Sequence, residues 1–117
     1  MLFRTLDSLG ALYSLMSEVD DMRKRMFYFF KMLREYQLVS LIVMERPLGS
    51  EAMLLGNEGF LVDGIILLGL DRNHGKVTRY LQVEKMRACE HSMEKHAIEA
   101  RRGGVSILGP IFETRSP

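Results

Sequence analysis

Three side chains that can carry positive charge lie close together in the C-terminal half of the chain. Lys85 and Arg87 are two residues apart, and His91 follows after a short loop. If one strand runs through this segment, Lys85 and Arg87 point the same way, about 6 to 7 Å apart, because strand side chains alternate. A point charge beside a planar guanidinium suits a phosphate group. A solvated strand end would show the same spacing, so both interpretations stay open.

A hairpin is predicted to position these side chains. The segment 77–87 is predicted as one strand, with Ile65 to Leu70 as the strand before it and Asp71 to Gly75 as the turn. Alternation puts five residues of the second strand on one face, namely Val77, Arg79, Leu81, Val83 and Lys85. His74 is interpreted as a turn residue only.

The N-terminal half predicts a strand, two helices and a second strand. A short apolar run ends at Asp7 and Ser8, which cap a following helix or contact a ligand. Helices are predicted over 9–16 and 18–36, the second from an apolar stripe of Val19, Met22, Met26, Phe29, Phe30 and Leu33. The run Leu38 to Met44 predicts a strand covered on both faces. Glu45 follows it and is expected to be a charged residue at an exposed strand end.

Composition narrows the function classes. The chain has 117 residues, of which 47% are hydrophobic, enough for one small domain. A net charge of +1 gives no electrostatic case for nucleic acid or an anionic membrane. The basic cluster Arg23–Arg25 is expected to be a solvated helix face. We expect no signal peptide and no membrane span, because the longest apolar run, Ile65 to Leu70, is too short to cross a bilayer.

The single cysteine limits redox and metal chemistry. Cys89 alone excludes an internal disulfide and a site with several thiolates, and it fits a reducing, cytoplasmic setting. Cys89, His91, Glu94 and His96 lie close in sequence, but their spacing is not that of a known zinc site. We therefore expect no metal cluster here.

The run Glu84 to His91, EKMRACEH, resembles the C-terminal half of a KaiC-like domain of the RecA-type P-loop ATPase superfamily. In that family a strand ends in Lys-hydrophobic-Arg, followed by a small residue, usually Gly, and shortly after by a His. The matching residues are Lys85, Met86, Arg87, Ala88 and His91. The resemblance implies that Lys85 and Arg87 reach across a subunit interface to the phosphates of ATP bound by the neighbouring subunit.

The N-terminal half resembles the same family. The run LDSLGAL, Leu6 to Leu12, matches the Walker B element and the start of the helix after it, which implies that Asp7 helps to hold Mg²⁺ through water. Arg4 and Thr5 depart from the usual apolar strand. Glu45 matches a polar residue that faces the nucleotide at the end of the next strand.

The resemblance covers about Leu6 to Val105. The sequence contains no G-x-x-x-x-G-K-[ST] motif, whose backbone and lysine cradle phosphates, nor the Glu pair that follows it. The resemblance therefore implies a truncated ATPase domain: its C-terminal half over 1–109, then a tail over 110–117. The expected fold is α/β, a partial RecA-like sheet with flanking helices and an antiparallel C-terminal hairpin region.

We therefore expect a KaiC/RecA-like protein that does not hydrolyse ATP alone and has no cofactor of its own. Loss of the first half would expose strand edge and apolar surface, which predicts a homo-oligomer or a P-loop-bearing partner. One alternative is a split ATPase subunit whose Lys85 and Arg87 serve ATP and Mg²⁺ held by that partner. Another is a nucleic-acid-binding module, suggested by RecA ancestry and Arg23–Arg25.

Overall fold

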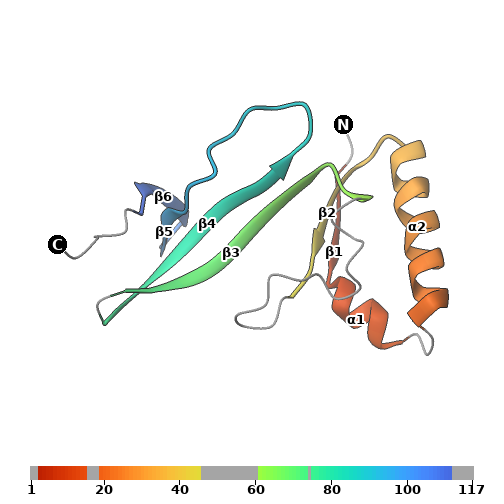
Figure 1. The fold of residues 1–117 in the computed structure, drawn as a ribbon, viewed down its shortest axis with the longest axis horizontal. Coiled ribbons are helices and arrows are strands. Elements are labelled where there is room, and N and C mark those ends of the chain that lie inside the picture. The colour runs from red at the N-terminus through yellow and green to blue at the C-terminus, as the bar shows by residue number, and fades with distance from the viewer. Residues whose placement is uncertain (1–2, 16–18, 46–60, 74, 112–117) are drawn as a thin grey trace. The chain divides into compact units, whose positions relative to one another are not determined.

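The computed structural model describes residues 3–15, 19–45, 61–73 and 75–111. The chain forms two compact units, Met1–Val62 and Asp63–Pro117, and each is described by itself. Helices lie in the first unit, and the second consists of strands and loops (Figure 1).

The first unit contains a parallel pair of strands and two helices. Its elements are β1 (Phe3–Asp7), α1 (Leu9–Ser14), α2 (Val19–Glu35) and β2 (Val39–Val43). β1 and β2 pair in parallel, from Phe3 opposite Val39 to Asp7 opposite Val43. Both predicted helices and both predicted strands are confirmed. The prediction that β2 is covered on both faces was wrong, because Leu41 and Val43 are exposed. Among the described residues, no helix is long and apolar enough to cross a membrane.

The core of the first unit is small. Leu9 of α1 and Met26 and Phe30 of α2 are buried, and Leu9 is only 1% exposed. Half-buried apolar residues pack around them, among them Leu6, Phe29, Leu33 and Ile42. The predicted stripe on the second helix is confirmed from Met26 to Leu33, because residues three and four apart share a helix face. The side chains of Val19 and Met22 lie outside the described residues.

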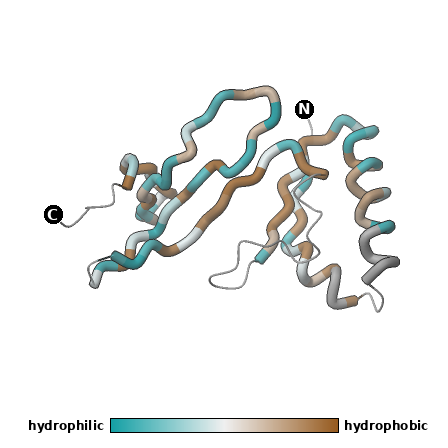
Figure 2. Tube along the Cα trace, viewed as in Figure 1, coloured by the Kyte–Doolittle hydropathy of each residue, from teal (hydrophilic) through white to brown (hydrophobic). Residues whose placement is uncertain are grey.

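The second unit is an antiparallel sheet of four strands in the order β3-β4-β5-β6. The strands are β3 (Gly64–Asn73), β4 (Lys76–Met86), β5 (His96–Arg101) and β6 (Gly104–Pro110). The predicted hairpin is confirmed, but β3 continues to Asn73, so the turn is shorter than predicted. The apolar run that specifies β3 is visible in the tube coloured by hydropathy (Figure 2). Ile111 N–H donates to the Lys95 carbonyl at 2.8 Å, just beyond β6.

A β-bulge changes the face on which Lys85 lies. Ile65 pairs with Lys85 but Ile66 pairs with Val83, so Glu84 is an extra residue in β4. Residues directly opposite each other share a face, so Lys85 lies on the face of Gln82 rather than that of Val83. The prediction that placed Lys85 on the face of Val83 was wrong. It assumed strict alternation, which a single inserted residue reverses.

The loop between β4 and β5 is attached to the sheet by two side chains. Gln82 Nε2 donates to the Met93 carbonyl at 2.8 Å. Lys95 Nζ lies 4.6 Å from the centroid of the Tyr80 ring, a cation–π contact. The ring lies over Gly69, where a Cβ would come within 2.6 Å of ring atoms. Glycine at 69 therefore makes room for the ring that holds Lys95.

Candidate functional site

Two carboxylates lie at the carboxyl ends of the two parallel strands. Asp7 is the last residue of β1 and pairs with Val43, the last residue of β2. Glu45 follows two residues later, and both carboxylates are exposed. Ligands of parallel sheets bind at the carboxyl ends of the strands, so a charged ligand is expected at this end of the strand pair. The ligand roles of Asp7 and Glu45 stay predictions.

Ser8 is part of the start of α1. Its Oγ accepts a hydrogen bond from the Ala11 N–H at 3.2 Å, and its carbonyl accepts from the Leu12 N–H at 3.3 Å. The peptide bond between Asp7 and Ser8 is cis. A side-chain oxygen that accepts from the N–H three residues later is a helix N-cap. The capping interpretation of Ser8 is confirmed, and a ligand role for it stays a prediction.

In the second unit, Arg87 is held at the end of the β3–β4 hairpin. Its backbone N–H donates to the Asp63 carbonyl at 2.7 Å, which continues the pairing one step beyond Met86. Its Nη1 lies 2.8 Å from Asp63 Oδ1. The two side chains are 47% and 72% exposed, and exposed ion pairs contribute only about 0 to 1 kcal/mol. Asp63 thus orients Arg87 without binding it strongly.

Lys85 shares a face with Arg87 despite the bulge. Ile65 lies opposite Lys85, and Asp63 lies opposite Arg87, so the two cations occupy successive positions on one side of the hairpin end. Lys85 is half-buried and Arg87 is exposed. An ammonium and a guanidinium that project from the same side can bind a group with several anionic oxygens, such as a polyphosphate.

His91 lies in the loop that Gln82 and Lys95 attach to the sheet. Its Nδ1 is 3.0 Å from the Ser92 carbonyl oxygen, and the side chain is half-buried. A phosphate contact by His91 stays a prediction. In the part of the chain that the structure describes, no three His, Cys, Asp or Glu side chains are grouped to hold a metal ion.

Sequence reasoning missed Asp63, the partner of Arg87. Counting back across the hairpin from its turn would have placed Val62 opposite Arg87, because only the bulge at Glu84 brings Asp63 into that position. An acidic residue opposite an arginine at the end of a strand pair predicts such a cross-strand ion pair.

Ala88 has a backbone conformation that favours glycine, with φ 62°. We expect Ala88→Gly to raise the free energy of unfolding by about 0.5 to 1.5 kcal/mol, because a left-handed conformation costs a residue with a Cβ about 1 to 2 kcal/mol. Urea unfolding checks this result. Ala100→Gly in β5 is the matched control and should lower stability instead, since glycine weakens a strand. A loss of stability in Ala88→Gly would contradict the argument.

Comparison with known proteins assigns this arrangement to a family. The sequence profile of the ATPase KaiC matches residues 4–111, which spans both units. A UPF0273 protein of Methanopyrus kandleri is 33% identical over 104 residues, covering 87% of this chain and 40% of that protein. A UPF0273 protein of Pyrobaculum aerophilum is 47% identical over 47 residues, covering 40% of this chain and 17% of that protein.

A solved structure agrees with the sequence comparison. The KaiC-like protein from Pyrococcus horikoshii superposes with a TM-score of 0.79 at 26% identity, over 90% of this chain and 48% of that chain. The chain thus spans less than half the length of these relatives. The match of the profile to nearly all of the sequence, together with this similarity of fold, shows that the chain belongs to the KaiC family of ATPases.

Proposed function

We propose that this chain is a non-catalytic KaiC-like module that functions by association, with a second copy or with a partner that carries a P-loop. The observation that supports this proposal most directly is the open face of the β1–β2 sheet. Parallel sheets occur almost only where both faces are covered, since their strands are apolar on both sides.

One face of the β1–β2 sheet is covered and the other is exposed. Leu6 and Ile42 pack toward the core that α2 forms. Phe3 and Leu41, which alternate with them, are 66% and 58% exposed, and Val43 is exposed beside them. In the described part of the chain, β1 and β2 have no further strand partner. Apolar side chains next to unpaired strand edges favour pairing with another chain.

Hydrogen exchange at two protein concentrations tests where association occurs. We expect the amides of Phe3–Asp7 and Val39–Val43 to exchange more slowly at the higher concentration, because association removes this edge and face from water. The amides of β4, which is flanked on both sides in its own sheet, serve as the internal control. Equal protection of β1 and β2 at both concentrations, in a sample whose mass increases, would contradict association at this sheet.

A second function is supported by the cations at the end of β4. In this function, Lys85 and Arg87 contact the phosphates of ATP, with its Mg²⁺, bound by another chain. The shared face of Lys85 and Arg87 and the orientation of Arg87 by Asp63 support it. Asp7 and Glu45, at the carboxyl ends of β1 and β2, would likewise face the bound ATP and Mg²⁺.

Binding of inorganic tripolyphosphate tests this second function on the chain itself. We expect Arg87→Ala and Lys85→Ala each to weaken binding about tenfold, because each removes a charge-assisted contact. Asp63→Asn should strengthen binding, since it removes the carboxylate that competes for Arg87. Titration calorimetry at fixed ionic strength measures all three variants. Arg72→Ala, which removes an exposed arginine of β3, is the control. An equal loss of tripolyphosphate affinity in Arg72→Ala would show that positive charge attracts the anion without a specific site.

A further inference from the structure

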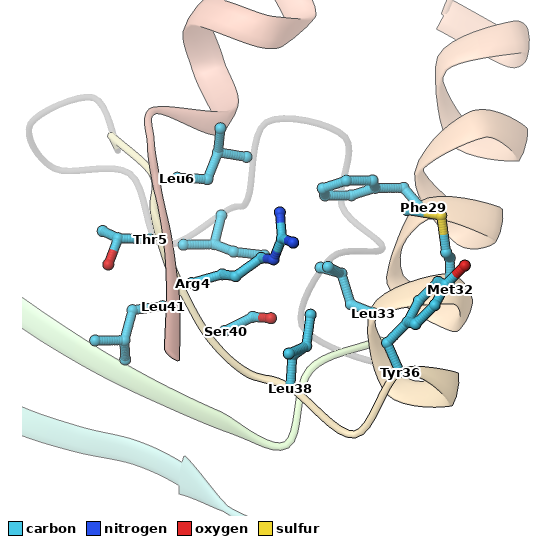
Figure 3. A pocket seen from close by; sticks show the side chains of 11 residues that line it. Arg4, Thr5, Leu6, Phe29, Met32, Leu33, Tyr36, Leu38, Ser40 and Leu41 are labelled. Carbon is cyan, nitrogen blue, oxygen red and sulfur yellow. The ribbon is translucent and has the colours of Figure 1, made fainter. Parts of the chain in front are cut away.

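A cavity of about 500 Å³ lies between the β1–β2 sheet and α2, within the first unit. Its volume falls in the range of about 300 to 1,000 Å³ that is usual for small-molecule sites. Phe29 and Leu33 face it from α2, and Arg4, Leu6 and Ser40 face it from the strands, whereas Thr5 and Leu41 point away (Figure 3).

Two polar side chains lie next to each other on the strand side of this cavity. Arg4 of β1 pairs in register with Ser40 of β2, so the two side chains occupy neighbouring positions on one face. The Ser40 hydroxyl oxygen is buried and has no hydrogen-bond partner among the described residues. The Arg4 guanidinium extends into the space below Phe29, and no described residue forms an ion pair with it (Figure 3).

The remaining wall is apolar, and this determines what can fill the cavity. Phe29, Leu33 and Leu38 are half-buried around the two polar groups, and none of the described lining residues is acidic. A buried hydroxyl without a partner costs free energy, and an arginine beside an apolar wall attracts an anion. A ligand that satisfies both groups carries an anionic oxygen at one end and hydrocarbon at the other.

We propose that this cavity binds an amphipathic carboxylic acid, with Arg4 and Ser40 contacting the carboxylate and the α2 side chains contacting the hydrocarbon body. A carboxylate has two oxygens, so one accepts from the guanidinium while the other accepts from the hydroxyl. The geometry places both donors on one side and Phe29 and Leu33 on the other. This site is independent of the association surface, which lies on the opposite face of the sheet.

The first test uses the unmodified chain and three ligands of equal length. Titration calorimetry below micelle-forming concentrations compares decanoate, 1-decanol and decylamine. Decanoate should bind at least about tenfold more tightly than 1-decanol, and decylamine should bind least, because only the carboxylate can pair with Arg4. Equal affinity for decanoate and 1-decanol, or no binding of decanoate, would overturn the proposal.

Variants then assign the contacts. Arg4→Gln should weaken decanoate binding about tenfold and leave 1-decanol binding unchanged. Ser40→Ala should fold normally, because it removes a hydroxyl without a partner, and should weaken decanoate binding severalfold. Leu33→Trp should block both ligands by filling the cavity. Arg72→Gln in β3 is the charge-matched control and should bind as the unmodified chain does. If Arg72→Gln lost as much decanoate affinity as Arg4→Gln, the contact between Arg4 and the carboxylate would be overturned.

Discussion

Replacing Leu9 with alanine should lower the free energy of unfolding of the first unit by about 2 to 5 kcal/mol. Leu9 is 1% exposed and contributes, with Met26 and Phe30, the buried core of that unit among the described residues. Truncating a leucine in such a site removes its transfer free energy and leaves a cavity that neighbouring side chains fill only in part. In a core of this size, the loss is a large fraction of total stability.

The measurement is urea unfolding followed by circular dichroism at 222 nm, since both described helices belong to the first unit. Leu15→Ala is the matched control, because Leu15 follows α1 directly but is 84% exposed. Its effect should stay within about 0.5 kcal/mol. A similar loss in the two variants would show that Leu9 is not part of a cooperative core.

Replacing Leu41 with aspartate should raise the dissociation constant for association by about 30-fold or more. Leu41 lies on the exposed face of β2 and points away from the cavity on the other face (Figure 3). An aspartate in the middle of an apolar interface would be buried without a partner, and truncating a central contact already costs about 2 kcal/mol or more. Because Leu41 is exposed in the unassociated chain, its replacement should change monomer stability little.

Sedimentation velocity over a range of concentrations measures this change. Leu15→Asp adds the same charge at another exposed leucine of the first unit and should leave association unchanged. Leu68→Asp adds it to the apolar face of β3 and shows whether the second sheet contributes. Association of Leu41→Asp with the affinity of the unmodified chain would place the interface elsewhere.

Much of the architecture follows from local sequence patterns. The stripe from Met26 to Leu33 predicted α2, and the β-branched run from Leu38 predicted β2. The polar, glycine-containing turn before Lys76 predicted the β3–β4 hairpin. These elements were predictable because hydrophobic periodicity and turn chemistry are properties of a few neighbouring residues.

The site was less predictable because its details depend on pairing between strands. The bulge at Glu84 places Lys85 on the other face of β4 from the one predicted. No residue type in β4 indicates that a residue is inserted there. Asp63 meets Arg87 only because β3 and β4 are in this register. The cavity at Arg4 and Ser40 requires β1 and β2, which are far apart in sequence, to lie side by side. Register is a tertiary property, so alternation within one strand cannot supply it.

Light scattering over a dilution series tests the central claim most directly. The chain has a mass of 13.5 kDa. An association module should have a molar mass above this value at high concentration, decreasing toward it on dilution, whereas Leu41→Asp should remain near 13.5 kDa at the same concentrations. A mass of 13.5 kDa for both proteins throughout, with no binding of a dye that detects apolar surface, would contradict the account.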